Sequence, residues 1–442
     1  MKKIIIGVVV ILGIAAVSAP FGSGILMERV VRDTFGNANT MYASSGHDTS
    51  IEIVRYDRGF SSSEIEWKVK FGKMKALYGF DEIVFVDRAE HGMGGIVSKT
   101  SLEKNPWYTD FISKKLGGKD PLHITTAYKL AGGIESTLAN DSFSMPAADG
   151  KAVTIKPGKV VVACDKGLKH FTSEASWEGL GLEGQLAVGG VSMKSALTMI
   201  SPFIWDGNVS MGLKNTQIDD NKGHLDLTNL KIDYVLNYDK DKNTLSAKAE
   251  YGVDTVTLGQ EKISNIFARI GISGLDAKNY EEFMKTYTST VSAMMGDIAA
   301  AKDDPEKMQQ LLDKKMAVVG FQMVALGEKL LTKGLELQIS DLRFQAPEGE
   351  IKGDVTVSLK KDMTFAQFVP VVSQPSLALD IITLRSNLSL PDKLVGDDPM
   401  LFAPIYPGMQ TGIFVKNGNM AVHKAETKDG KLFVNDKELV LK

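Results

Sequence analysis

Four oxygen-bearing residues near the middle of the chain have the spacing of a calcium-binding loop. Asp239, Asp241 and Asn243 alternate along a polar segment, and Glu250 stands at the twelfth position. A hard cation such as Ca²⁺ needs several converging oxygens, which this order supplies. However, the sixth position is Thr244, where the sharp turn of such a loop requires glycine, and the flanking residues alternate as strands do. A charged hairpin turn is the simpler interpretation, and we expect no metal here.

The other patterns that could carry chemistry are weaker. Gly179, Gly181 and Gly184 have the spacing of a dinucleotide-binding loop, but the following residues 185–190 look extended, whereas the loop must open a helix. The six histidines are scattered without metal-like pairing, and the chain has no Walker loop or nucleophile-elbow sequence. The sequence therefore predicts no catalytic residue, no cofactor and no enzyme.

Composition narrows the class of protein. The 442 residues include 51 Lys and Arg against 54 Asp and Glu, with 43% hydrophobic and 24% charged residues. These values are ordinary for a globular protein and exclude a disordered tail, a collagen, a multi-span transporter and a strongly basic nucleic-acid binder. The single cysteine, Cys164, excludes an internal disulfide framework.

The amino terminus predicts a membrane anchor. Lys2 and Lys3 precede a charge-free run from Ile4 to Met27, which is long enough to span a bilayer. Cleavage after Ala19 is the alternative, but it would leave proline as the first mature residue, a poor fit to a protease-bound extended chain. We therefore expect an uncleaved single-pass anchor over residues 1–27, with its start in the cytoplasm and the remaining chain exported.

The exported part alternates apolar and polar residues at period two, which indicates half-buried antiparallel strands. The alternating runs are 50–56, 64–71, 152–163, 209–213, 225–237, 244–256, 335–339 and 350–359, with a small meander over 412–441. Apolar residues from Tyr280 to Ile298 recur every three or four positions, which predicts a helix, and Asp304-Pro305 predicts the start of a second one. A short helix is expected over 28–41.

These elements predict a β-rich (α+β) fold: a transmembrane helix, then an extended antiparallel sheet with a helical insertion. We divide the chain into the anchor 1–27, a β-rich region 28–274, the insertion 275–334 and a carboxyl-terminal β region 335–442.

Several short segments, spread in order over nearly the whole chain, carry a family resemblance. They contain Tyr56, Arg58, Gly59, His91, Gly92, Trp177, Pro347, Glu348, Gly349, Gly430 and Asn435. This set resembles the YdgA/YihF-like family of bacterial envelope proteins, a domain of unknown function. Met93 and Asp436 depart from the family pattern, at positions where we expect proline and glycine. The resemblance implies an inner-membrane anchor with a β-rich periplasmic body, and it supplies no catalytic residue.

Two of these residues admit a functional and a structural interpretation. Arg58 can bind a phosphate or the carboxylate of a partner, or pair locally beside a tight turn at Gly59; we favour the second. His91 can act as an acid or base, or stand at a turn beside Gly92; again we favour the turn.

We therefore expect an envelope protein that acts by binding. One apolar sheet face can hold a lipid-type ligand in a groove, as in the AsmA-like envelope proteins, or it can be covered and leave an interaction module for an envelope protein or a second copy of the chain. The sequence does not separate these two. A periplasmic hydrolase is the competing class.

Overall fold

A computed structural model describes residues 27–46, 48–71, 80–92, 95–129, 133–147, 150–220, 223–300, 309, 324–367, 370, 374–394 and 405–440. The chain divides into two compact units. Unit one comprises Met1–Glu183, Ser192–Phe203 and Lys285–Ala317; unit two comprises Gly184–Val191, Ile204–Met284 and Val318–Lys442.

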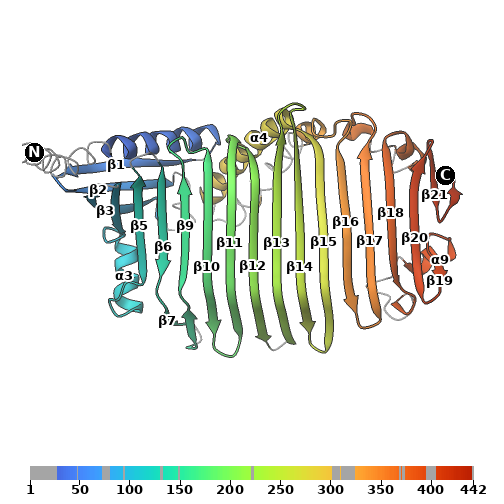
Figure 1. Ribbon diagram of the computed structural model, residues 1–442, viewed down its shortest axis with the longest axis horizontal. Coiled ribbons are helices and arrows are strands. Elements are labelled where there is room, and N and C mark those ends of the chain that lie inside the picture. The colour runs from blue at the N-terminus through green and yellow to red at the C-terminus, as the bar shows by residue number, and fades with distance from the viewer. Residues whose placement is uncertain are drawn as a thin grey trace, which may run out of the picture. The chain divides into compact units, whose positions relative to one another are not determined.

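The strands of unit one form an antiparallel sheet (Figure 1). They are β1 (Thr49–Arg58), β2 (Ser62–Phe71), β3 (Glu82–Gly92), β4 (Gly95–Ser101), β5 (Leu122–Lys129), β6 (Ile134–Asn140), β7 (Phe143–Pro146), β8 (Ala152–Ile155), β9 (Gly158–Cys164) and β10 (His170–Leu182), with helix α3 (Pro106–Lys115) after β4. Pairing follows β1-β2-β3-β4-β5-β6-β9-β10, and the β7–β8 hairpin joins β10 through β8. The sheet is therefore a meander with one short hairpin inserted between β6 and β9.

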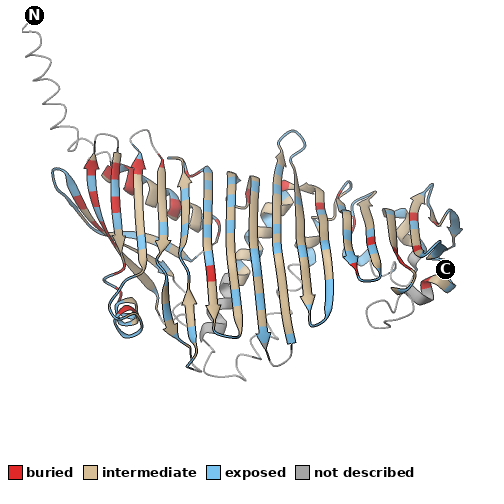
Figure 2. Cartoon of the chain, turned by 60° about the horizontal axis from the view of Figure 1, so that its bottom comes forward, coloured by how far each residue is buried: buried red, intermediate tan, exposed pale blue. Residues whose placement is uncertain are grey.

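The core of unit one lies between this sheet and a helix over 27–44. Met27, Val30 and Val31 are spaced to share one helix face, and all three are buried. Figure 2 shows buried residues gathered on this helix and the first strands. The buried sheet residues of the cluster are Ile65, Ala89, Ile96 and Tyr128. The expected helix over 28–41 is thus confirmed, and packing of its apolar face holds it on the sheet.

Two asparagine side chains complete strand hydrogen bonding in unit one. Asn39, on the helix over 27–44, accepts from the N–H of Ile51 (2.7 Å) and donates to its carbonyl (2.8 Å). Asn105 does the same for Val84, at 2.9 and 2.6 Å. Each amide mimics one residue of an adjacent strand and satisfies backbone groups of β1 or β3.

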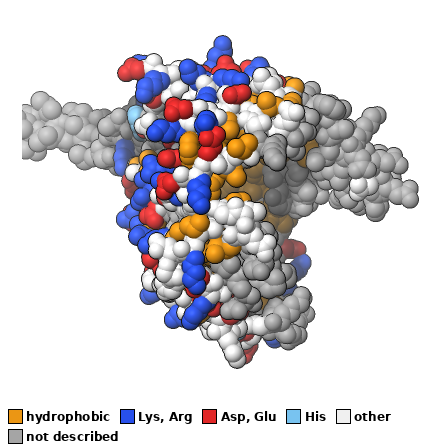
Figure 3. Space-filling view, turned by 90° about the vertical axis from the view of Figure 1, so that its right-hand side faces the viewer, with side chains coloured by type: hydrophobic (Ala, Val, Ile, Leu, Met, Phe, Trp, Pro, Cys, Tyr) orange, Lys and Arg blue, Asp and Glu red, His pale blue; other side chains and the backbone are white. Residues whose placement is uncertain are grey.

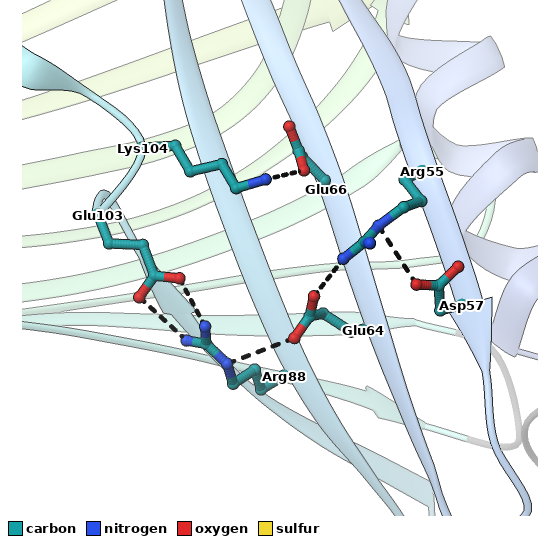
Figure 4. A network of polar contacts seen from close by, with 7 residues as sticks. All are labelled: Arg55, Asp57, Glu64, Glu66, Arg88, Glu103 and Lys104. Carbon is teal, nitrogen blue, oxygen red and sulfur yellow. Dashed lines mark hydrogen bonds and ion pairs between the residues drawn. The ribbon is translucent and has the colours of Figure 1, made fainter.

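Oppositely charged residues alternate along the other face of β1–β3 (Figure 4). Glu64 accepts from Arg55 at 2.5 Å and lies 3.6 Å from Arg88, its cross-strand partner. Arg88 also donates to both carboxylate oxygens of Glu103, and this hydrogen bonding lowers the pKa of Glu103. The network also contains Asp57, Glu66 and Lys104. These side chains are mostly well exposed, so each pair contributes about 0–1 kcal/mol and the face stays solvated.

Unit two is an antiparallel meander from β12 to β18, after which β20 pairs with β18 on one edge and with β19 and β21 on the other. Its strands are β12 (Ile204–Asp220), β13 (Gly223–Asp239), β14 (Thr244–Leu258), β15 (Glu261–Asp276), β16 (Glu336–Ala346), β17 (Gly349–Leu359), β18 (Ile382–Pro391), β19 (Val415–Asn417), β20 (Met420–Lys428), β21 (Lys431–Val434) and β22 (Lys437–Leu439), with η1 (Pro375–Asp380) and α9 (Ile405–Gln410). Strand β11 (Leu186–Ser201) begins in unit two and ends in unit one, as does helix α4 (Ala277–Ala300). Asp276 caps α4, because its carboxylate accepts from the N–H of Asn279 at 2.8 Å.

The β-rich antiparallel fold with few helices is confirmed, as are the helix around 280–298 and the carboxyl-terminal meander. The run 152–163 is not one strand but two, β8 and β9, separated at Pro157. The expected second helix, starting at 305, falls almost entirely outside the described residues, as does the predicted anchor except for Met27. Within the described ranges, no helix is long and apolar enough to cross a membrane.

Candidate functional site

One face of the sheet in unit two is lined by apolar residues that run across the strands. Side chains of directly opposed residues in neighbouring strands share a face, so the strand register defines rows of neighbours. One row contains Val209, Tyr234, Ala249, Ile270, Ile339 and Val355. A second contains Met211, Ile232, Tyr251, Ala268 and Leu342, and a third Leu236, Ala247, Ile272, Leu337, Val357 and Leu384.

This face, which we call the apolar face, is not fully covered by described residues. Ile270 is 44% exposed and Leu337 is 53% exposed. Seen from the carboxyl-terminal end, charged side chains gather on one side and hydrophobic side chains show beside them (Figure 3). The register explains the separation, because the residues between the apolar rows point to the opposite side of the sheet.

The apolar face leads into a pocket of about 270 Å³ on β16–β18. Leu337, Val357 and Ile382 form its floor, and the other lining residues come from the end of β17 and from the segments before β16, after β17 and before β18. These are Leu331, Leu335, Leu359, Met363, Ala378 and Ile381. All nine lining residues are apolar. A cavity of this chemistry accepts a hydrocarbon chain and repels ions, because nothing in its wall would replace their hydration.

A second hollow, of about 210 Å³, lies next along the same strands. Its wall includes Ile339 and Val355, which stand two residues from Leu337 and Val357 of the pocket. It ends at a polar pair, where Ser386 Oγ and His423 Nε2 are 2.9 Å apart. The apolar face therefore continues from the pocket to polar groups, an arrangement suited to an amphipathic ligand.

Five residues that carry the family resemblance meet at one end of unit one. The N–H of Gly59 donates to the carbonyl of Ser62 at 2.8 Å, and a Cβ at Gly59 would lie 3.1 Å from that oxygen. The N–H of His91 donates to the carbonyl of Ser61 at 2.9 Å and so joins the end of β3 to the β1–β2 turn. The five residues are Tyr56, Arg58, Gly59, His91 and Gly92.

Arg58 ties this turn to the helix over 27–44. Its Nη1 donates to Glu28 Oε2 at 2.9 Å, and Glu28 also accepts from Arg32. The pairing that we expected to be local therefore spans 30 residues of sequence. Arg32 in turn lies over the ring of Tyr56, with its Cζ 5.8 Å from the ring centre. The turn, the helix and Tyr56 are thus joined by charge-assisted and cation–π contacts.

Besides Ser386 and His423, one further serine–histidine pair with hydrogen-bond spacing in the described residues is Ser63 and His91. Ser63 Oγ and His91 Nε2 are 2.8 Å apart, as in a nucleophile with its base. Both side chains are buried, and within the described part of the chain His91 Nδ1 has no hydrogen-bond partner. A catalytic base needs a third group that orients it and a path for substrate. The pair therefore fits a structural role beside the turn better than acyl chemistry.

Asp87 is a second buried polar group of unit one. Its carboxylate accepts from Trp67 Nε1 at 3.0 Å and from the hydroxyl of Thr100. Burial raises the pKa of Asp87, and the two hydrogen bonds offset part of that rise. Burial likewise raises the pKa of the neighbouring Tyr128.

The tryptophan of the resemblance has a packing role. Trp177, in β10, donates from Nε1 to the carbonyl of Lys156 at 3.0 Å. A Cβ at Gly158 would lie 2.8 Å from the indole ring, so Gly158 leaves the space that Trp177 fills.

The remaining family residues lie at hairpin turns of unit two. Pro347 and Glu348 are exposed between β16 and β17, and a Cβ at Gly349 would lie 2.8 Å from Pro391. Gly430 has φ +75°, and Asn435 and Asp436 both have positive φ. Asp436 replaces the expected glycine without loss of the turn, since Asp tolerates this backbone region. Met93, the other departure, lies outside the described residues.

The calcium-loop residues do not converge. Asp239 Oδ1 accepts from the N–H groups of Asp241 and Lys242, and Asn243 accepts from Tyr238. Glu250 lies in β14 and pairs with Lys248 and Arg269, both at 2.9 Å. The segment is the β13–β14 turn, as the hairpin interpretation predicts. In the part of the chain that the structure describes, no group of three or more His, Cys, Asp or Glu could hold a metal ion.

The dinucleotide-like glycines also have no phosphate-binding geometry. Gly179 and Gly181 lie within β10, and the chain then enters β11, a strand. The helix that would direct its dipole at a pyrophosphate is replaced by a hairpin.

Fold and surface thus define an antiparallel β protein with an apolar face on the sheet of unit two. The chain matches the family described as bacterial protein of unknown function (DUF945) over residues 1–442, and it belongs to that family. No curated protein and no solved structure matches it. The expectation of a bacterial family of unknown function is confirmed.

The sequence did not indicate the residues that close the pocket. Leu331, Met363, Ala378 and Ile381 lie outside the strands and show no period that distinguishes them. The alternation in β16 and β17 does indicate the floor, because Leu337 and Val357 follow period two. Which connecting segment folds over that floor depends on tertiary contacts that local patterns do not encode.

Proposed function

We propose that this chain is an inner-membrane-anchored periplasmic protein of the bacterial envelope that binds a lipid-type ligand along the apolar face of unit two. Within DUF945 we place it with the YdgA/YihF-like envelope proteins that it resembles. The charge-free run from Ile4 to Met27 after Lys2 and Lys3 supports the anchor, with the amino terminus in the cytoplasm. The proposed action is binding and not catalysis.

The observation that carries this proposal is the pocket of about 270 Å³ with nine apolar lining residues at one end of the apolar face. Burial of hydrocarbon yields about 25 cal/mol per Å² of apolar surface removed from water. A chain lying on the three apolar rows and entering the pocket gains this free energy over its length. The polar Ser386–His423 pair at the neighbouring hollow offers hydrogen bonds to a headgroup.

A protein partner on the same face is the second candidate. Because protein interfaces gain most from residues that fill pockets, such a partner would insert an apolar side chain into this one. The burial of Ser63 and His91 disfavours a hydrolase that uses this pair.

Lipid retention tests the proposal. The full chain is purified from membranes, and organic extracts are compared by mass spectrometry for the wild type, Val357→Trp and Val235→Trp. Val357 lines the pocket, whereas Val235 is 48% exposed and its neighbours in the register, Asn208 and Lys248, are polar. Phospholipid or fatty acid above the level of an unrelated anchored protein is expected with the wild type and Val235→Trp, and at least about tenfold less with Val357→Trp.

The lipid proposal fails if the wild type carries no lipid above that level, or if Val357→Trp retains as much as Val235→Trp while both melt as the wild type does. Crosslinking in cells that captures an envelope protein through Val357, with no lipid, would establish the partner alternative.

The location is tested separately. Protease added to spheroplasts is expected to degrade the chain beyond the helix over 27–44 without lysis. Protection of the whole chain until lysis would contradict a periplasmic body.

A further inference from the structure

The charged face of unit two contains a hollow of about 570 Å³, on the side of the sheet opposite the apolar face. Its centre is one row of the register, in which Gly252 lies between Lys231 and Phe267, and Arg343 is next. Most of the neighbouring lining residues are polar, namely Asn229, Asp254, Asn265, Gln345 and Glu350, whereas Val253, Ile266 and Phe344 are apolar. All lining residues of the hollow belong to strands β13–β17, which are part of unit two.

Gly252 makes this hollow, and the fold does not require a glycine there. A Cβ built at Gly252 meets no atom within 4 Å. By contrast, a Cβ at Gly271 would lie 2.9 Å from Gln338, and one at Gly353 would lie 2.8 Å from the carbonyl of Asn387. Glycine inside a strand costs about 0.5–1 kcal/mol relative to alanine. A bare backbone in an interior strand, with open space above it, is typical of a place where a ligand approaches closely.

The wall of the hollow combines an aromatic ring with polar groups of both kinds. Phe267 lies beside Arg343, whose Cζ is 4.8 Å from the ring centre. Asn229 donates to Asp254 at 2.7 Å, which places an amide beside a carboxylate. The carboxylates have nearby donors: Lys231 lies 2.8 Å from Asp233, and Arg269 lies 2.9 Å from Glu250.

This balance of donors and acceptors selects the class of ligand. A phosphate calls for donors alone, and a metal ion calls for converging acceptors alone. A hydroxyl group both donates and accepts, so a ligand with many hydroxyls can pair with alternating amides, carboxylates and cationic groups. Its ring carbons can pack on the flat backbone at Gly252, as in ligand sites that combine apolar surface with a few polar groups. Phe267 stands beside Gly252, and the Cζ atoms of Arg343 and Arg269 lie over its ring at 4.8 and 5.4 Å from the centre.

We propose that this hollow is a carbohydrate-binding site that takes a neutral oligosaccharide. The site is separate from the apolar face in both position and chemistry. A chain with both sites can hold a lipid-type ligand on one face of unit two and a glycan on the other.

The test uses the full chain in a detergent without a sugar headgroup, titrated calorimetrically with cellotetraose, maltotetraose and chitotetraose. The variants are Gly252→Leu, which fills the hollow, and Gly36→Leu, a control in the helix over 27–44 where an added Cβ also meets no atom. At least one tetrasaccharide is expected to bind the wild type and Gly36→Leu, and to bind Gly252→Leu at least about tenfold more weakly. Gly252→Leu should melt no lower than the wild type, because the new side chain meets open space.

Absence of binding by all three saccharides at millimolar concentration overturns the proposal, as does equal binding by Gly252→Leu. Inorganic phosphate and tetralysine are titrated in parallel, and binding of either in place of the saccharides, with loss in Gly252→Leu, would show that the hollow takes an ion. Val357→Trp is expected to keep saccharide binding, which separates this outcome from failure of the lipid proposal.

Discussion

At the scale of single residues, Asp87 carries a carboxylate inside the core of unit one. The side chain is 3% exposed and accepts hydrogen bonds from Trp67 and Thr100. Because burial disfavours the charged form, the folded protein binds a proton at Asp87 more tightly than the unfolded chain does. The hydrogen bonds from Trp67 and Thr100 orient the carboxylate, but they offset only part of the free energy lost when the charged group leaves water.

This cost makes stability depend on pH in a defined direction. The pKa of Asp87 is raised on folding, so its contribution to the free energy of unfolding falls as pH rises from the unfolded value of about 3.9 through the folded value. Asp87→Asn removes this dependence, because an amide does not titrate and can still pair with Trp67 and Thr100. The variant should gain stability relative to the wild type between about pH 3 and pH 7.

Urea unfolding of both proteins at the two pH values measures the change, with Glu348→Gln at an exposed turn as the control for charge. A difference between Asp87→Asn and the wild type that stays constant with pH, or moves the other way, would show that Asp87 is not the source.

The ion pair between Glu28 and Arg58 is the residue-scale link between the helix over 27–44 and the β1–β2 turn. Both side chains are partly exposed, at 27% and 33%, so we expect a coupling energy of about 0.2–1 kcal/mol from a double-mutant cycle with Glu28→Gln and Arg58→Gln. Added salt should reduce this coupling. A coupling energy of zero in low salt would mean that the ion pair does not stabilise the packing of the helix against the turn.

At the scale of elements, the sequence predicts what alternation and helical period can encode. The strands β1, β2, β13 and β14 have one solvated and one apolar face, so period two reveals them. Strands such as β10 and β11 were not identified in the sequence. In β10, Ser173 occupies a position on the same face as Phe171 and Ala175, which blurs the contrast. In β11 the glycines Gly189 and Gly190 interrupt it.

The site is predicted less well than the fold. The segments that carry the resemblance identify the turn at Gly59 and the residue His91. They do not indicate that the N–H of His91 donates to the carbonyl of Ser61 in that turn, because this contact arises only when β2 pairs with β3. The hollow at Gly252 has no sequence signal, because a glycine without steric need looks the same in the sequence as one that the fold requires.

Asn39 connects the helix over 27–44 to strand β1 through two hydrogen bonds to Ile51. Asn39→Ala removes both hydrogen bonds to Ile51 and leaves the backbone groups of Ile51 without this partner. We expect the free energy of unfolding to fall by about 1–3 kcal/mol and amide hydrogen exchange in β1 to accelerate. Asn37→Ala is the matched control, since Asn37 is exposed on the same helix. Equal exchange in β1 for the two variants would contradict the bridging role.

At the scale of the whole molecule, each unit is a meander whose sheet has one face with apolar residues and one face with charges. In unit one the helix over 27–44 packs on the apolar residues, and ion pairs cross the charged face of β1–β3. In unit two the apolar face includes exposed side chains and ends in the pocket on β16–β18. Unit two also has a packed core, at Ala346, Ile351, Leu390 and Ala421, so the same strand pattern gives packed cores in both units and, in unit two, an apolar pocket as well.

The most direct test of the lipid proposal locates the bound chain. A fatty acid with a photoreactive diazirine on its alkyl chain is crosslinked to the purified protein, and the labelled peptides are identified by mass spectrometry. We expect labels on the pocket segments of β16–β18 and η1, reduced in Val357→Trp but not in Val235→Trp. Labels on the charged face around Lys231, or spread evenly over both faces, would contradict an apolar binding face.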